Sequence, residues 1–120
     1  MDIEDFRNYC IQKQGVTEEF PFDDVTLVFK VMGKMFALTS LDREQLSINL
    51  KCDPEKAVEL REQYEGVQAG YHMNKKHWNT VFVESIKPQK LVLEWIDDSY
   101  NLVVASLTKK LKDELKSLSK

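Results

Sequence analysis

Two strand-like segments joined by one short turn constrain the fold of this chain most. Val25 to Val31 is rich in β-branched and aromatic residues, and Met35 to Thr39 continues that composition. Between them lies Met32-Gly33, and glycine accepts the positive φ that a tight hairpin turn requires. Residues 46–51 then alternate between apolar and polar side chains, which is the period of a strand with one buried face. The sequence therefore predicts three consecutive strands connected by hairpins.

Helix signals flank these strands. Asp2 precedes a helical stretch over residues 3–14, and Gly15 follows it as a stop signal. Asp53-Pro54 combines a capping aspartate with a proline at the first helical position, and this predicts a second helix that ends at Gly66. From Pro88 to Leu118 apolar residues recur every three or four positions, so we expect a helical region that breaks between Asp97 and Lys109.

The remaining segment adds two strands. Val67, Ala69 and Tyr71 alternate with other residues, the strand pattern resumes over residues 80–84, and residues 72–79 are expected to form a long hairpin loop. The predicted order is α-β-β-β-α-β-β-α(α), in which helices and strands do not alternate strictly. It favours a two-layer α+β fold, with an antiparallel sheet and hairpins packed against helices, in one domain over residues 1–120.

Composition and charge narrow the class of protein. The longest apolar run, residues 102–105, is far shorter than a membrane span, and the first residues are acidic where a signal peptide is basic. We therefore expect a cytoplasmic protein without membrane contact. Residues 1–65 carry eight Lys/Arg and fourteen Asp/Glu, whereas residues 66–120 carry nine Lys and six Asp/Glu. Cys10 and Cys52, which are far apart and outside any CxxC motif, are expected to be free buried thiols.

Residues 70–79 are the strongest candidate site. This segment collects both histidines, a tyrosine, a tryptophan and two lysines at a strand connection, where scaffolds commonly place recognition groups. A zinc site needs three or four convergent ligands, and the chain offers no such spacing around His72 and His77. No nucleophile elbow, phosphate loop or HExxH motif is present. We expect no catalytic residues, no metal and no cofactor.

Several stretches together are similar to the MmcQ/YjbR family of small bacterial proteins. They occur in the family's order and span most of the chain: Phe20-Pro21-Phe22, residues 28–37, Leu50-Lys51-Cys52-Asp53-Pro54, residues 70–78 and Ser99-Tyr100-Asn101-Leu102-Val103. The resemblance implies a compact α+β fold with hairpins described as a double wing, related to the frataxin-like CyaY shape. It also implies double-stranded DNA binding as a possible function, without established catalytic residues or cofactor.

This leads to two functional hypotheses from different classes. In the first, hairpin wings contact double-stranded DNA: Lys75 and Lys76 neutralise phosphate charge, Asn74 and His77 supply hydrogen bonds, and Lys34 and Tyr71 assist. Trp78 is an alternative stacking residue or a core anchor. In the second hypothesis the protein is an interaction adaptor or chaperone-like module that binds a protein partner and no nucleic acid. A monomer is expected in both cases.

Overall fold

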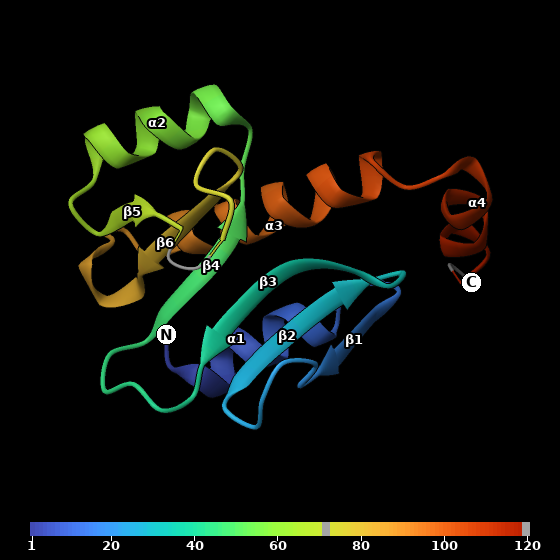
Figure 1. The fold of residues 1–120 in the computed structure, drawn as a ribbon, viewed down its shortest axis with the longest axis horizontal. Coiled ribbons are helices and arrows are strands. Elements are labelled where there is room, and N and C mark those ends of the chain that lie inside the picture. The colour runs from blue at the N-terminus through green and yellow to red at the C-terminus, as the bar shows by residue number, and fades with distance from the viewer. Residues whose placement is uncertain (71–72, 119–120) are drawn as a thin grey trace.

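The computed structural model describes residues 1–70 and 73–118 of the chain. Six strands form one antiparallel sheet in the order β1-β2-β3-β4-β6-β5, which confirms the predicted α+β class (Figure 1). The elements are α1 (Ile3–Ile11), β1 (Val16–Glu19), β2 (Thr26–Val31), β3 (Lys34–Ser40), β4 (Ser47–Lys51), α2 (Pro54–Gln63), β5 (Val67–Ala69), β6 (Trp78–Phe82), the 3₁₀-helix η1 (Val83–Ser85), α3 (Lys90–Ala105) and α4 (Lys109–Ser117). Within the described ranges no helix has the length and apolar character needed to cross a bilayer.

The predicted helix starts are confirmed by their caps. The Asp2 side chain accepts a hydrogen bond from the backbone N–H of Asp5, and the Asp5 side chain accepts one from the N–H of Asp2, which satisfies two otherwise unpaired donors. Asp53 accepts from the N–H of Lys56 at the start of α2. The predicted break in the C-terminal helical region falls at residues 106–108, where the Thr108 side chain caps α4.

The core lies between the sheet and the helices on one of its faces, and Leu115 of α4 also belongs to it. Phe6 of α1 packs edge-on against Phe29 of β2, with ring centroids 5.4 Å apart, and Phe36 of β3 meets Tyr100 of α3 at 5.3 Å. Leu60 of α2 belongs to the same buried cluster. Figure 1 shows α1 and α3 behind the sheet and α2 beside β5 and β6. The opposite face carries a small separate cluster formed by Val28, Leu38 and Trp78, with no described helix over it.

The structure differs from the sequence-based prediction at the end of the first helix, in an additional strand and at both ends of the last strand. The first helix ends at Ile11 instead of residue 14, and β1, which the predicted order lacks, follows it. Its four residues include two glutamates, which have low strand propensity, and only the antiparallel pairing with β2 makes them a strand. The last strand begins at Trp78, two residues earlier than predicted, because residues 78 and 79 pair with β4. It ends at Phe82, and the chain then turns into η1.

Ser99 of α3 closes a gap between the two halves of the sheet. The pairing of β3 with β4 covers only Ala37–Thr39 against Ile48–Leu50, and the next pair would be Phe36 and Lys51. The Ser99 hydroxyl accepts from the Lys51 N–H at 2.8 Å and donates to the Phe36 carbonyl at 2.5 Å. Ser99 is fully buried. Its hydroxyl group therefore takes the place of a direct backbone hydrogen bond between β3 and β4, at the point where the two strands diverge (Figure 1).

Replacing Ser99 tests this connection. Ser99→Ala leaves a partly buried backbone donor and a buried acceptor without their partner, and we expect the free energy of unfolding to fall by about 1–3 kcal/mol. Chemical denaturation measures the loss, and native-state hydrogen exchange should show faster exchange at the Lys51 amide. Asn101→Ala, at an exposed position two residues along the same helix, is the matched control and should change little. Equal stability of the two variants would contradict the bridging role.

Candidate functional site

Residues 73–77, in the connection between β5 and β6, are held in place by the surrounding backbone. The Trp78 N–H donates to the Asn74 carbonyl at 2.9 Å, and the Cys52 N–H donates to the His77 carbonyl at 2.7 Å. The Arg61 guanidinium of α2 reaches the Lys75 carbonyl at 3.1 Å. These bonds anchor the connection to both β4 and α2. The candidate loop is therefore a positioned element of the fold.

Lys75 and Lys76 are exposed at this connection. Four of the chain's other cations are paired: Arg7 with Glu18, Lys13 with Asp97, Lys30 with Glu19 and Lys56 with Asp98. Among the described residues no ion pair involves Lys75 or Lys76, and both side chains are exposed. Two adjacent lysines on an anchored turn can thus present their charge to an anionic partner without first breaking an ion pair.

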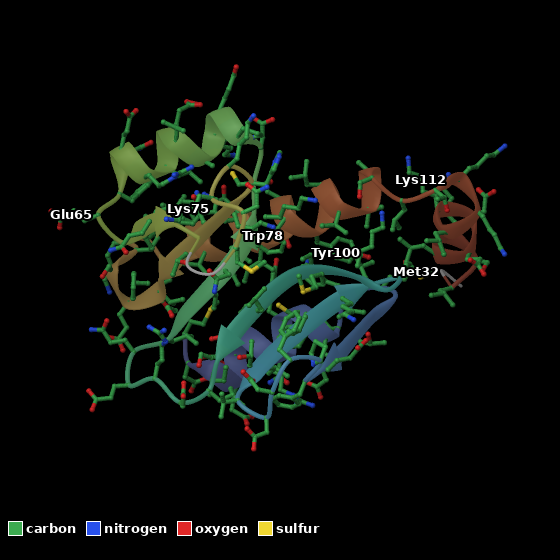
Figure 2. All side chains as sticks on the ribbon, viewed as in Figure 1. Met32, Glu65, Lys75, Trp78, Tyr100 and Lys112 are labelled. Carbon is green, nitrogen blue, oxygen red and sulfur yellow. The ribbon has the colours of Figure 1, made fainter. Side chains whose placement is uncertain are left out.

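Lys34 belongs to a different part of the surface. It is exposed at the first position of β3, directly after the turn at Met32 and Gly33, which both have positive φ. The strand pairings place this turn and residues 73–77 at the same end of the sheet, but β4 lies between β3 and β6. In Figure 2 Met32 lies beside α4, whereas Lys75 lies near α2. The structure therefore groups Lys34 with the lysines of α4 and apart from Lys75 and Lys76.

The remaining predicted site residues differ in how far their side chains are exposed to a ligand. The Asn74 side chain accepts from the Lys76 N–H at 2.9 Å, so it shapes the turn. His77 is half-buried, and Trp78 is 8% exposed against Val28 and Leu38. Burial of Trp78 confirms the core-anchor alternative and excludes a stacking role for its ring. The predictions for Tyr71 and His72 lie outside the described residues.

A groove on the helix-free face of the sheet was missing from the sequence-based candidates. It has a volume of about 760 Å³, and its floor includes Asn49 and Thr80, whose side chains hydrogen-bond to each other at 2.6 Å. Its rim comes from the connections before β2 and after β3, including Phe22, Asp23 and Arg43. In the sequence, the polar residues that alternate along β4 indicated that one face of this strand is not part of the apolar core. Finding the groove also requires the strand pairing that brings β3, β4 and β6 side by side.

The fold and this exposed, anchored connection define a small α+β domain that resembles known proteins over most of its length. A family model described as YjbR matches residues 11–102. The uncharacterized protein YbdF of Escherichia coli O157:H7 is 43% identical over 91 residues, covering 76% of this chain and 75% of the relative. The uncharacterized protein YjbR of E. coli K12 is 31% identical over 104 residues, covering 87% of this chain and 88% of the relative.

A solved structure agrees with the family match. Protein DR2400 of Deinococcus radiodurans, described as a DUF419 domain, superposes with a TM-score of 0.88 at 41% sequence identity, covering 95% of this chain and 87% of that protein. The chain belongs to the YjbR family. The predicted resemblance to this family is thus confirmed. The family match includes both hairpin connections and the groove but ends before α4.

The two cysteines are poorly suited to nucleophilic chemistry. Burial raises the pKa of the Cys10 thiol to about 12, and Cys10 has no exposed surface. Burial also raises the pKa of Cys52, which is half-buried at the end of β4. A thiol attacks as its thiolate, so a raised pKa lowers its reactivity near neutral pH. Within residues 1–70 and 73–118 no three His, Cys, Asp or Glu side chains are gathered so as to hold a metal ion.

Alkylation rates test this assignment of the thiols. With iodoacetamide at about pH 8 we expect Cys10 to remain unmodified in the folded protein and Cys52 to react more slowly than an unfolded cysteine. Mass spectrometry of tryptic peptides at timed intervals gives both rates. The same protein in guanidinium chloride is the control, and there both thiols should react equally. A Cys10 that reacts in the native protein as fast as it does when unfolded would contradict its burial.

Proposed function

We propose that this protein is a monomeric, non-catalytic binding protein whose ligand is double-stranded DNA. The observation that carries the proposal is the pair of exposed lysines, Lys75 and Lys76, which have no ion-pair partner in the described structure and lie on a connection anchored to β4 and α2. Lysines that project from a rigid turn suit contact with phosphates, which position a protein on a duplex.

The second hairpin supplies the other half of this proposal. Lys34 follows the turn at the same end of the sheet, and the neighbouring helix α4 adds four lysines, at positions 109, 110, 112 and 116. Two cationic regions at one end of the sheet are consistent with two separate contacts along a duplex. Lys75 and Lys76 supply the primary contact and Lys34 the secondary one, while Asn74 supports the turn and His77 supplies a hydrogen bond.

The net charge sets the expected strength of binding. The chain has a net charge of −3, and α2 carries exposed glutamates at positions 55, 59 and 62 close to the turn that contains Lys75 and Lys76, called the lysine turn below. We therefore expect weak binding that depends little on base sequence and falls steeply as salt increases, because phosphate contacts release counterions.

Charge reversal at the lysine turn tests the proposal. Fluorescence anisotropy of a labelled duplex of about 20 base pairs, at about 50 and 200 mM salt, should show saturable binding that weakens at the higher salt. Lys75→Glu/Lys76→Glu should weaken binding at least about tenfold at low salt and reduce the salt slope by about two, one for each lost phosphate contact. Lys75→Arg/Lys76→Arg should retain binding.

The matched control places the same charge change at the other end of the sheet. Lys87 and Lys90 are exposed and follow the C-terminal end of β6, which is opposite the lysine turn. Lys87→Glu/Lys90→Glu changes the net charge by the same amount and should weaken binding far less than Lys75→Glu/Lys76→Glu. Absence of binding by the unmodified protein at low salt, or equal loss in both double variants, would refute the assignment of this turn as a DNA contact.

A further inference from the structure

The end of the sheet opposite the lysine turns has an exposed apolar surface surrounded by carboxylates. Phe20 is 49% exposed, Phe22 64% and Leu41 45%, and these residues lie on the connection before β2 and the connection after β3. Large apolar side chains exposed together on a soluble protein commonly mark an interaction site. Both connections lie in the lower part of Figure 1, away from α4 and from the turn between β2 and β3.

Hydrogen bonds hold these exposed side chains in position. The Asp23 side chain accepts from the Val25 N–H at 3.0 Å and from the Thr26 N–H at 2.7 Å, which closes the turn after Phe22. The Leu41 N–H donates to the Val25 carbonyl at 2.7 Å and thereby joins the two connections. A surface built on such bonds loses less conformational entropy when it binds than a loose loop would.

The two connections that carry these side chains are predominantly negative in charge. Asp23 and Asp24 lie on the first connection, and Asp42 and Glu44 lie on the second, where Arg43 is the single cation. The hydrogen bonds from Thr26, and then from Val25, lower the pKa of Asp23, so that carboxylate is ionised at neutral pH. The same charge repels phosphate groups, which argues against nucleic acid or an anionic membrane as the occupant.

The groove of about 760 Å³ opens directly beside these residues, and its rim includes Phe22, Asp23 and Asp42. Its size is within the usual range for small ligands and short segments, about 300–1,000 Å³, and is too small for a folded domain. Polar side chains from adjacent strands, such as Ser40 of β3 and Asn49 of β4, line it together with apolar ones. They can hydrogen-bond to the backbone of an extended chain while Leu38 and Phe82 contact its apolar side chains.

We propose that this acidic, apolar-rimmed groove binds an extended basic peptide segment of a partner protein, in which an apolar side chain flanked by lysine or arginine packs against Phe22. Charge complementarity supports a basic partner, and the exposed rigid phenylalanine supports an apolar anchor. The inference is independent of DNA binding, because the residues it uses lie at the opposite end of the sheet from Lys75 and Lys76.

The test is a titration of isotope-labelled protein with a synthetic peptide of alternating lysine and apolar residues, Lys-Leu-Lys-Phe-Lys-Leu-Lys, followed by amide chemical shifts. We expect saturable shifts confined to the groove, over residues 22–26, 38–43 and 47–49. Phe22→Ala removes an exposed side chain and should weaken binding at least about tenfold. Asp24→Lys/Glu44→Lys, at exposed positions, should abolish binding at moderate salt.

Two controls make the result specific. Val58→Ala removes another exposed apolar side chain, 48% exposed on α2, and should leave peptide affinity unchanged. The same peptide with glutamate in place of lysine should not bind. Absence of saturation, shifts centred on other elements, or equal binding of the acidic peptide would overturn the proposal. Concentration-dependent shifts of the groove amides in the protein alone would assign the surface to a second copy of this chain, and would also overturn it.

Discussion

The arrangement of the sheet depends on two buried hydroxyl groups where its halves join. Strands β1, β2 and β3 form one half and β4, β6 and β5 the other, but β3 and β4 pair over only three residues. Ser99 completes the pairing at one end of this short ladder, and at the other end Thr39 donates to the Ser47 carbonyl at 2.6 Å. Both hydroxyls are buried, where an unpaired backbone group is costly. The two side chains thus let the halves diverge without leaving buried polar groups unsatisfied.

The joined sheet separates two surfaces of opposite character. Its strands direct the turn before Lys34 and the turn at Lys75 to one end, and they direct Phe22 and Asp42 to the other. Helices cover one face completely enough to bury the aromatic core, and the other face keeps an open groove. A small domain of this kind can present an anion-attracting end and a cation-attracting end simultaneously, because the sheet keeps them apart. The net negative charge of the protein weakly repels an anionic ligand, and this favours contact of such a ligand with the lysine-bearing end alone.

Much of the fold could be predicted from local signals. Asp2, Asp53 and Thr108 cap helices through their own side chains, so those starts are visible in sequence, and Gly33 indicates its hairpin turn through its backbone freedom. The strand β1 was missed because Glu18 and Glu19 carry no strand signal, and pairing with β2 supplies one only after the chain has folded. Within the candidate site, the exposure of Lys75 and Lys76 could be anticipated from their type and position, whereas the sequence left two alternatives for Trp78, and its burial decided between them.

The sequence alone determined the family, the α+β class and most of the local elements, because alternation, caps and turn residues act over a few neighbouring positions. Tertiary structure decided which of these elements meet. It separated Lys34 from Lys75, because β4 lies between β3 and β6. It also brought Ser99 into contact with Lys51, which is 48 residues earlier in the chain, and placed β3, β4 and β6 side by side so that they form a groove. Such relations depend on register and on the side of the sheet that the helices cover. These are properties of contacts between distant segments, and no local pattern specifies them.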